Sequence, residues 1–156
     1  MVRKDRTIHI CVVASSGGHL TQLLQIREAW SEFPACYAST SQISLNSLEL
    51  KGRAYLIEEA SRKRVLKTLI TLLQCCWIIF RERPNVVISS GSGSGCLMCI
   101  IGKLSGAKIV WLDSIANAAC LSLSGRIIRP FADLCLSQWP EVAKKYKGVE
   151  YLGTVI

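Results

Sequence analysis

The feature that most constrains this chain is a series of short, continuously apolar runs separated by segments of helical periodicity. In IHICVVA (8–14), NVVISS (85–90) and KIVWLD (108–113), the apolar residues are consecutive rather than alternating with polar ones. Strands of parallel sheets in α/β proteins are covered on both faces and show this pattern. The sequence therefore predicts an α/β fold, with a Rossmann-like parallel sheet and helices on both of its faces.

The remaining elements continue this alternation within a single domain, residues 1–156. Strands are expected at 8–14, 35–40, 54–59, 85–90, 108–113, 133–137 and 149–155, helices at 19–30, 62–82, 96–106, 122–131 and 140–146, and a loop at 41–53. A chain of this length is long enough to bury a sizeable core.

Two loops rich in serine and glycine each connect an expected strand to an expected helix. SSGG (15–18) follows the strand at 8–14, and SSGSGSG (89–95) follows the strand at 85–90. Ligands bind beyond the carboxyl ends of parallel strands, and the N–H groups that begin a helix attract phosphate. The residues predicted to bind a phosphate or diphosphate are Ser16, Gly17, Gly18, Ser90, Gly91, Ser92, Gly93, Ser94 and Gly95. A tight strand-to-helix turn without a ligand is the alternative.

Two titratable residues are candidates for catalysis at the same edge of the sheet. His19 begins the helix after the first loop, where a neutral imidazole can take a proton from a substrate hydroxyl or hydrogen-bond a phosphate. Asp113 follows an apolar strand and can orient His19 or bind a sugar hydroxyl. For both residues, the alternative is that they only cap the next helix.

The net charge restricts the partners. The chain carries 19 Lys and Arg against 11 Asp and Glu, a net charge of +8, which favours phosphorylated substrates or an anionic membrane surface. Nucleic acid is not an expected partner, because the basic residues form separate short groups without interleaved aromatic residues. The glycine loops do not match the dinucleotide pattern G-x-G-x-x-G, and Gly102-Lys103 is followed by leucine, so there is no P-loop.

The eight cysteines are expected to be reduced thiols in the cytosol, because no signal sequence precedes them. Cys96 and Cys99 form a C-x-x-C pair without a second ligand pair, and Cys75-Cys76 lies in an apolar helical run. Buried thiols that act as small hydrophobic side chains are the better interpretation, so we expect no metal and no cofactor.

The helix expected within 62–83 is apolar around most of its circumference. Its polar residues Lys67, Thr71 and Gln74 fall on one narrow stripe, and basic clusters flank both ends. The apolar stretch 65–80 is shorter than the roughly 20 residues that cross a bilayer. The pattern is typical of a helix lying in a membrane interface, although a core helix packed on the sheet is the alternative. The predicted membrane contacts are Arg64, Lys67, Trp77, Phe80 and Arg81.

Four segments in a fixed order carry a family resemblance. They are SSGGHLTQLL (15–24), RERPNVVISSGSGSG (81–95), LSLSGRIIRPFADLCLSQWPEVAKKY (121–146) and GVEYLGTVI (148–156). These segments resemble the Alg14-like family, which is related to the bacterial polysaccharide proteins called PssD or EpsE. The resemblance covers nearly the whole chain, and the last two segments add the most specificity.

The resemblance implies one half of a glycosyltransferase that is split between two chains. The fold would be the N-terminal half of a GT-B glycosyltransferase. This chain would bind a lipid-diphosphate-linked acceptor at a membrane, with His19 near the acceptor hydroxyl. An Alg13-like chain, of the PssE or EpsF type in bacteria, would bind the UDP-sugar donor and dock on Val155 and Ile156. The chain alone would then be inactive.

The resemblance also implies a location at the cytoplasmic face of a membrane, either the bacterial inner membrane or the endoplasmic reticulum. Attachment is expected to be peripheral or monotopic, because this chain does not begin with the spanning helix usual in eukaryotic relatives. The family usually has glutamate at Asp113, arginine near Asn117 and an acidic residue near Ala119, differences that indicate another acceptor or a weakened enzyme. Two other hypotheses stay open: a non-catalytic membrane anchor or scaffold, and a stand-alone nucleotide-binding protein such as a small reductase.

Overall fold

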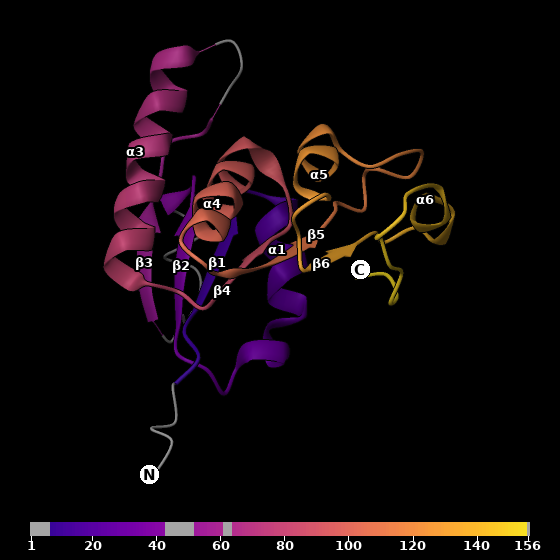
Figure 1. Cartoon of the computed structure of the whole chain (residues 1–156), viewed down its shortest axis with the longest axis horizontal. Helices are drawn as coiled ribbons and strands as arrows, with labels where there is room; N and C mark the ends of the chain where they lie inside the picture. The colour runs from indigo at the N-terminus through magenta and orange to yellow at the C-terminus, as the bar shows by residue number, and fades with distance from the viewer. Residues whose placement is uncertain (1–6, 43–51, 61–63, 156) are drawn as a thin grey trace.

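The computed structural model describes residues 7–42, 52–60 and 64–155. These residues form a parallel sheet with the strand order β3-β2-β1-β4-β5-β6 (Figure 1). The strands are β1 (Ile10–Ala14), β2 (Ala35–Ser39), β3 (Gly52–Leu56), β4 (Val86–Ser89), β5 (Lys108–Leu112) and β6 (Leu134–Leu136). The helices are α1 (Gly18–Gln25), α3 (Val65–Glu82), α4 (Ser92–Leu104), α5 (Leu123–Ile128) and α6 (Pro140–Lys145), with a 3₁₀ helix η1 (Arg27–Trp30).

The strand order reverses between β1 and β4. The chain runs outward from β1 through β2 to β3, crosses back through α3, and adds β4 on the other side of β1. This doubly wound order is that of a Rossmann-like sheet, in which ligands bind at the switch point beyond the carboxyl ends of the strands. The predicted fold class is therefore confirmed.

Strand β1 shows why the apolar runs are continuous. Cys11 and Val13 point into the core cluster under α3, α4 and α5, whereas Ile10, Val12 and Ala14 point into the cluster under α1 and Trp30. All five side chains are buried. Figure 1 shows the two layers, with α3, α4 and α5 on one face of the sheet and α1 on the other.

Three expected elements differ from the structure. The helix expected at 19–30 ends at Gln25 and continues as η1, and the helix expected at 96–106 begins earlier, at Ser92. The strand expected at 149–155 is wrong. Only Glu150 forms an isolated bridge, with Leu136, and Gly153 then takes a left-handed φ of +121°, which turns the chain away from β6.

Two other expectations fall near the limits of the described residues. The strand expected at 54–59 is shifted toward Gly52, so the end of the loop expected at 41–53 is part of β3. Most of that loop lies outside the described residues. Within the described ranges, the structure holds no helix with both the length and the hydropathy needed to cross a membrane.

The cysteines are all free thiols, and six of the eight are buried. Cys96 and Cys99 of the C-x-x-C pair lie in the core cluster under α4. Burial raises the pKa of the Cys99 thiol well above its ordinary value. Among the described residues, no three His, Cys, Asp or Glu side chains lie together as a metal site would require.

Candidate functional site

The two glycine loops are joined at the carboxyl ends of the neighbouring strands β1 and β4. The Nδ1 atom of His19 lies 3.0 Å from the main-chain carbonyl of Ser90, and the Ser90 hydroxyl donates to the main-chain carbonyl of His19 at 2.7 Å. The structure therefore brings His19 and the second loop together at the switch point, which is where a doubly wound sheet binds its ligands.

The hydrogen bond to Ser90 determines which nitrogen of His19 holds the proton. A carbonyl oxygen can only accept, so Nδ1 is the donor of this bond. In the neutral ring the Nε2 atom then carries the lone pair. A neutral His19 is thus arranged to accept a proton through Nε2.

Gly91 is required by the position of His19. A Cβ atom at Gly91 would lie 2.6 Å from Cε1 of the imidazole, and the residue has a φ of +139°. Gly17 also has a positive φ, +82°, but the space around it is open. The first glycine therefore serves the backbone turn alone, whereas the second also allows the ring to lie against the main chain.

Helices α1 and α4 begin at N-cap glycines, although in α4 the hydroxyl of Ser92 accepts from Gly95 N–H at 3.1 Å. Their N-cap residues are Gly17 and Gly91, which have no side chain to accept from the first N–H groups. Helix α5, by contrast, is capped by the Ser122 hydroxyl, which accepts from Gly125 N–H. The first N–H groups that no side chain caps, together with the positive end of each helix dipole, favour an anion at this edge.

The other predicted anion-binding residues are divided between different surroundings. Ser94 is buried, and its hydroxyl accepts from Ala60 N–H and donates to the Glu58 carbonyl. Gly93 packs against Ala60, and Gly95 packs against Ser89. Ser16 lines a separate pocket of about 300 Å³ beside Thr40 and Lys67. Gly91 and Ser92 are thus the predicted anion ligands that face the same pocket as His19.

That pocket has a volume of about 310 Å³ and lies between the second loop and the segment that follows β5. Small polar side chains dominate its lining: His19, Gly91, Ser92, Asp113, Ser114, Ala116, Asn117, Ser122, Leu123 and Ser124. Ser122 and Ser124, in the first turn of α5, were missing from the predicted site. Their signal in the sequence was a pair of serines at the start of a helix that follows a strand-end aspartate.

Asp113 is almost completely buried, and its carboxylate is already bonded. It accepts from the Ser122 hydroxyl at 2.5 Å, from Ser122 N–H at 2.8 Å and from the Trp111 indole at 3.2 Å. Among the described residues, no hydrogen bond joins Asp113 to His19. Asp113 therefore fixes the start of α5 at the edge of the pocket, while Ser90 orients the imidazole.

Helix α3 has its polar stripe turned inward. Lys67 forms an ion pair with Glu58 at 2.9 Å, Thr71 donates to the Glu58 carbonyl, and the Gln74 side chain accepts from Glu58 N–H. Lys67, a predicted membrane contact, is thus held on the side of α3 that faces the segment after β3.

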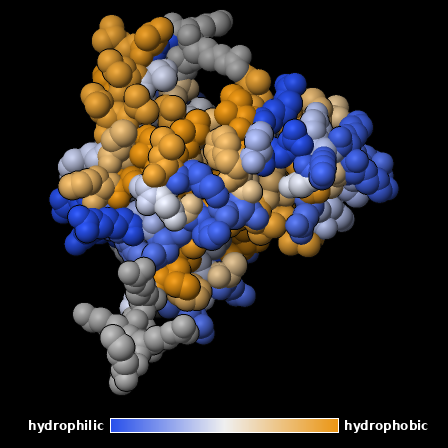
Figure 2. Space-filling model, in the orientation of Figure 1, coloured by the Kyte–Doolittle hydropathy of each residue, from blue (hydrophilic) through white to orange (hydrophobic). Residues whose placement is uncertain are grey.

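The outward surface of α3 is mostly apolar, and Figure 2 shows this apolar area over the upper part of the α3 side, with hydrophilic residues at the lower end. The exposed residues are Val65, Leu66, Leu69, Ile70, Leu73, Trp77 and Phe80. At about 100° per residue they occupy one arc of roughly 140°. A soluble helix normally turns such an arc toward the core, whereas α3 exposes this arc and packs Cys75, Ile78 and Ile79 of its other face into the core.

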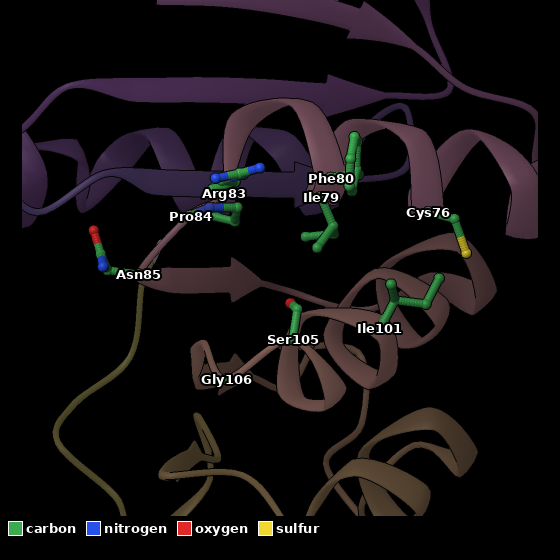
Figure 3. A pocket seen from close by; sticks show the side chains of 9 residues that line it. All are labelled: Cys76, Ile79, Phe80, Arg83, Pro84, Asn85, Ile101, Ser105 and Gly106. Carbon is green, nitrogen blue, oxygen red and sulfur yellow. The ribbon is translucent and has the colours of Figure 1, made fainter.

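Two arginine–aromatic pairs stand at the C-terminal end of α3. The guanidinium of Arg81 lies 5.1 Å from the Trp77 ring, and that of Arg83 lies 5.7 Å from the Phe80 ring. Beside them, a pocket of about 460 Å³ lies between the ends of α3 and α4 (Figure 3). This end of α3 leads into the amino end of β4, so the pocket lies at the edge opposite the glycine loops.

The doubly wound sheet, with two helices that begin at glycine N-caps at the switch point, defines a single Rossmann-like unit of the GT-B kind. Solved structures with this fold include MurG from Acinetobacter baumannii (TM-score 0.75, 14% identity, 94% of this chain and 45% of that one). They also include UDP-N-acetylglucosamine 2-epimerase from Rickettsia bellii (TM-score 0.74, 13% identity, 96% and 45%). This chain therefore spans less than half the length of either protein.

The chain belongs to the Alg14-like family. Residues 38–155 match the family model described as oligosaccharide biosynthesis protein Alg14 like. The chain is 32% identical to the UDP-N-acetylglucosamine transferase subunit alg14 of Schizosaccharomyces pombe over 94% of its own length and 83% of that protein. It is 31% identical to human ALG14, described with the same activity, over 99% of its length and 86% of that protein. The resemblance found in the sequence is confirmed.

Proposed function

We propose that this chain is the acceptor-binding subunit of a two-chain UDP-N-acetylglucosamine transferase that acts at a membrane surface on a lipid-diphosphate-linked acceptor. The family and the activity printed for the yeast and human relatives support the reaction class. The observation that carries the proposal is the His19 imidazole, held by Ser90 against Gly91 at the rim of a hydroxyl-lined pocket.

The chemical step requires a base for the attacking hydroxyl of the acceptor. With Nδ1 donating to Ser90, the lone pair on Nε2 of His19 is free to accept that proton. A carboxylate partner is not needed to orient the ring, because the main-chain carbonyl already does so. His19 is therefore the proposed catalytic base, and Asp113 positions the pocket through Ser122.

The acceptor diphosphate would bind at the N-termini of α1 and α4. Gly91 and Ser92 face the pocket. The N-cap residue of each helix is a glycine without a capping side chain, and in α4 the Ser92 hydroxyl takes only the Gly95 N–H. A diphosphate matches these donors and the positive helix ends. The hydroxyls of Ser114 and Ser124 and the amide of Asn117 line the other side of the pocket, where they can bind sugar hydroxyls of the acceptor.

The UDP-sugar is proposed to bind mainly to a second, Alg13-like chain. The description of the yeast and human relatives as transferase subunits supports a second chain, which would supply the other half of the GT-B fold. Stabilisation of the departing nucleotide diphosphate, which sugar transfer requires, would come from that half. The isolated chain would consequently be inactive.

Membrane binding is assigned to the outward arc of α3. Val65, Leu66 and Phe80 are each about three-quarters exposed, at 77%, 77% and 75%. Transfer of one large apolar side chain out of water is worth about 1.5–3 kcal/mol, so a helix lying in the interface gains from every such residue. Arg81 and Arg83, stacked on aromatic rings of the arc, are suited to phosphate groups of the lipids.

The test is reconstitution. The full chain and a purified Alg13-like chain are combined with vesicles that contain a lipid-diphosphate acceptor, and transfer from labelled UDP-N-acetylglucosamine is measured. We expect transfer only with both chains, and we expect His19→Ala to reduce it about 100- to 10,000-fold. Transfer by the Alg13-like chain alone at the rate of the pair would refute the catalytic part of the proposal.

A non-catalytic anchor is the second candidate, favoured by the exposed apolar arc of α3 and by the complete engagement of the Asp113 carboxylate. Undiminished transfer with His19→Ala, together with loss of membrane recruitment when the α3 arc is made polar, would favour this anchor.

A further inference from the structure

Gln138 is fully buried, and each polar atom of its side chain is bonded. Its Nε2 atom donates to Oε1 of Gln22 at 2.9 Å and to the main-chain carbonyl of Asp113 at 3.0 Å. Its Oε1 atom accepts from Val155 N–H at 2.9 Å, and its main-chain carbonyl accepts from the Thr154 hydroxyl at 3.0 Å. Loss of any one bond would leave a buried polar group unpaired, which is costly.

One of these partners, Asp113, lines the pocket described above, and another, Gln22, lies on the helix that carries His19. Gln22 lies on α1, about one helical turn after His19. Asp113 holds Ser122 at the opposite side of the pocket. One amide group thus joins the helix that carries the imidazole to the loop that carries the hydroxyls.

The other two partners belong to the segment 151–155. Val155, a predicted docking residue, is partly buried and packs against the apolar cluster that contains Leu20 and Leu23 of α1. Leu152 and Tyr151, in contrast, are 73% and 42% exposed. Ile156, the other predicted docking residue, lies outside the described residues. A chain that docks on this segment would therefore contact Tyr151 and Leu152. It would also affect the hydrogen bonds that Thr154 and Val155 of the same segment donate to Gln138.

We propose that Gln138 is a positioning residue that couples docking of the donor-binding chain on residues 151–155 to the geometry of His19 and Asp113. The inference rests on the two-chain function proposed above. Coupling between two binding sites is reciprocal. Docking of the partner should tighten binding of the acceptor, and the acceptor should tighten docking of the partner by the same factor.

The experiment compares wild type with Gln138→Met, which keeps an unbranched side chain of similar volume and removes its three hydrogen bonds. Gln25→Met makes the same change at an exposed position of α1 and is the control. Amide hydrogen exchange is measured for each full chain with and without the purified Alg13-like chain. In wild type and Gln25→Met we expect slower exchange at residues 151–155, 19–23 and 113–122. In Gln138→Met we expect slower exchange at residues 151–155 alone.

Acceptor affinity gives a second measurement, with a short prenyl diphosphate carrying N-acetylglucosamine as the probe. Addition of the partner should lower the Kd of the probe roughly tenfold in wild type, within the usual range of such couplings, and by less than about twofold in Gln138→Met. A merely structural role for Gln138 would lower the melting temperature and leave this ratio unchanged.

Gln22→Met is the second variant, and it keeps the test decisive if Gln138→Met does not fold. It interrupts the connection to α1 and leaves the bond to Asp113, so the slower exchange at 19–23 should disappear and that at 113–122 should remain. Hydrogen exchange that is slowed as in wild type in both Gln138→Met and Gln22→Met would overturn the inference. A wild-type pair that transfers sugar without distant slowing refutes the coupling alone, whereas a pair that neither docks nor transfers refutes the proposed function and the inference with it.

Discussion

The imidazole of His19 occupies the space that a side chain at Gly91 would need. A Cβ atom added at Gly91 would lie 2.6 Å from Cε1 and 2.9 Å from Nδ1 of His19. Since Nδ1 is also the atom bonded to the Ser90 carbonyl, the glycine and the carbonyl together fix the ring at one place on the second loop.

Gly91→Ala should therefore remove the imidazole from its position. The added methyl group breaks the bond between His19 and Ser90 and strains a backbone with φ of +139°. We expect a loss of about 1–3 kcal/mol in the free energy of unfolding and a fall in transfer by the two-chain enzyme as large as that of His19→Ala. Urea unfolding and the transfer assay measure the two effects.

Gly106→Ala is the matched control for this variant. Gly106 has a φ of +91° in open space, far from the glycine loops. It should show the cost of backbone strain and retain transfer per folded molecule. Equal transfer by the two glycine variants would contradict the assigned role of Gly91.

Leu73→Ser combined with Phe80→Ser should weaken binding to vesicles without unfolding the chain. Both residues belong to the outward arc of α3, where they are 62% and 75% exposed, so they contribute little to the core. The expected loss is about 1.5–3 kcal/mol of binding free energy per residue, measured by co-sedimentation with vesicles. Ile79→Ser, at a buried position of the same helix, should instead destabilise the fold. Unchanged sedimentation of the double variant would exclude the arc as the membrane contact.

The inward direction of the polar stripe on α3 could not be predicted from the helix itself. The periodicity of residues 65–80 reveals an apolar arc and a polar stripe but not which of them faces the sheet. Glu58 binds this stripe, its carboxylate, carbonyl and N–H contacting Lys67, Thr71 and Gln74. The sheet-facing side of α3 also packs Cys75, Ile78 and Ile79 into the core. These contacts depend on how α3 crosses back over β3, which is a property of the assembled fold.

The strands and the shared position of the loops could be predicted, because the sequence pattern that indicates each of them lies within a short stretch of the chain. A strand buried on both faces must be continuously apolar, as β1 is, and loops that follow parallel strands must share one edge. The carboxylate of Asp113 was visible as a strand-end residue, but its partner Ser122 is nine positions away and not in a regular element with it. The strand expected at 149–155 failed because Val155 N–H bonds to the Gln138 side chain instead of a neighbouring strand.

Asp113→Asn should separate positioning from catalysis. The asparagine keeps the shape of the side chain but turns one acceptor into a donor facing Ser122 or Trp111. We expect a loss of about 1–3 kcal/mol in the free energy of unfolding, the cost of an unpaired buried polar group. Faster hydrogen exchange should appear at residues 114–124, together with a higher KM for the acceptor. A large fall in kcat without any change in KM or exchange would instead identify Asp113 as a catalytic residue.

Asp133 should make the stability of the chain depend on pH in the acid range. Its carboxylate accepts from Lys103 at 2.8 Å, Ile109 N–H at 2.8 Å and Lys108 at 2.9 Å, and these bonds hold its pKa well below the ordinary value. Because the folded pKa is lowered, the stabilisation is complete above the unfolded pKa of about 3.9. It is lost as the pH falls through the folded pKa, where the folded carboxylate also takes up a proton.

Asp133→Asn tests whether the stabilisation by this carboxylate is lost as the pH falls. At neutral pH the variant should be about 1.5–3 kcal/mol less stable, the value of a hydrogen bond to a charged group. The difference from wild type should shrink as the pH falls below about 4. Urea unfolding between neutral and acid pH measures it. Glu141→Gln, which removes an exposed carboxylate 3.4 Å from Lys144, should follow the wild-type curve. A difference between wild type and Asp133→Asn that grew with acidity would show that the carboxylate is not held in its ionised form by these three donors.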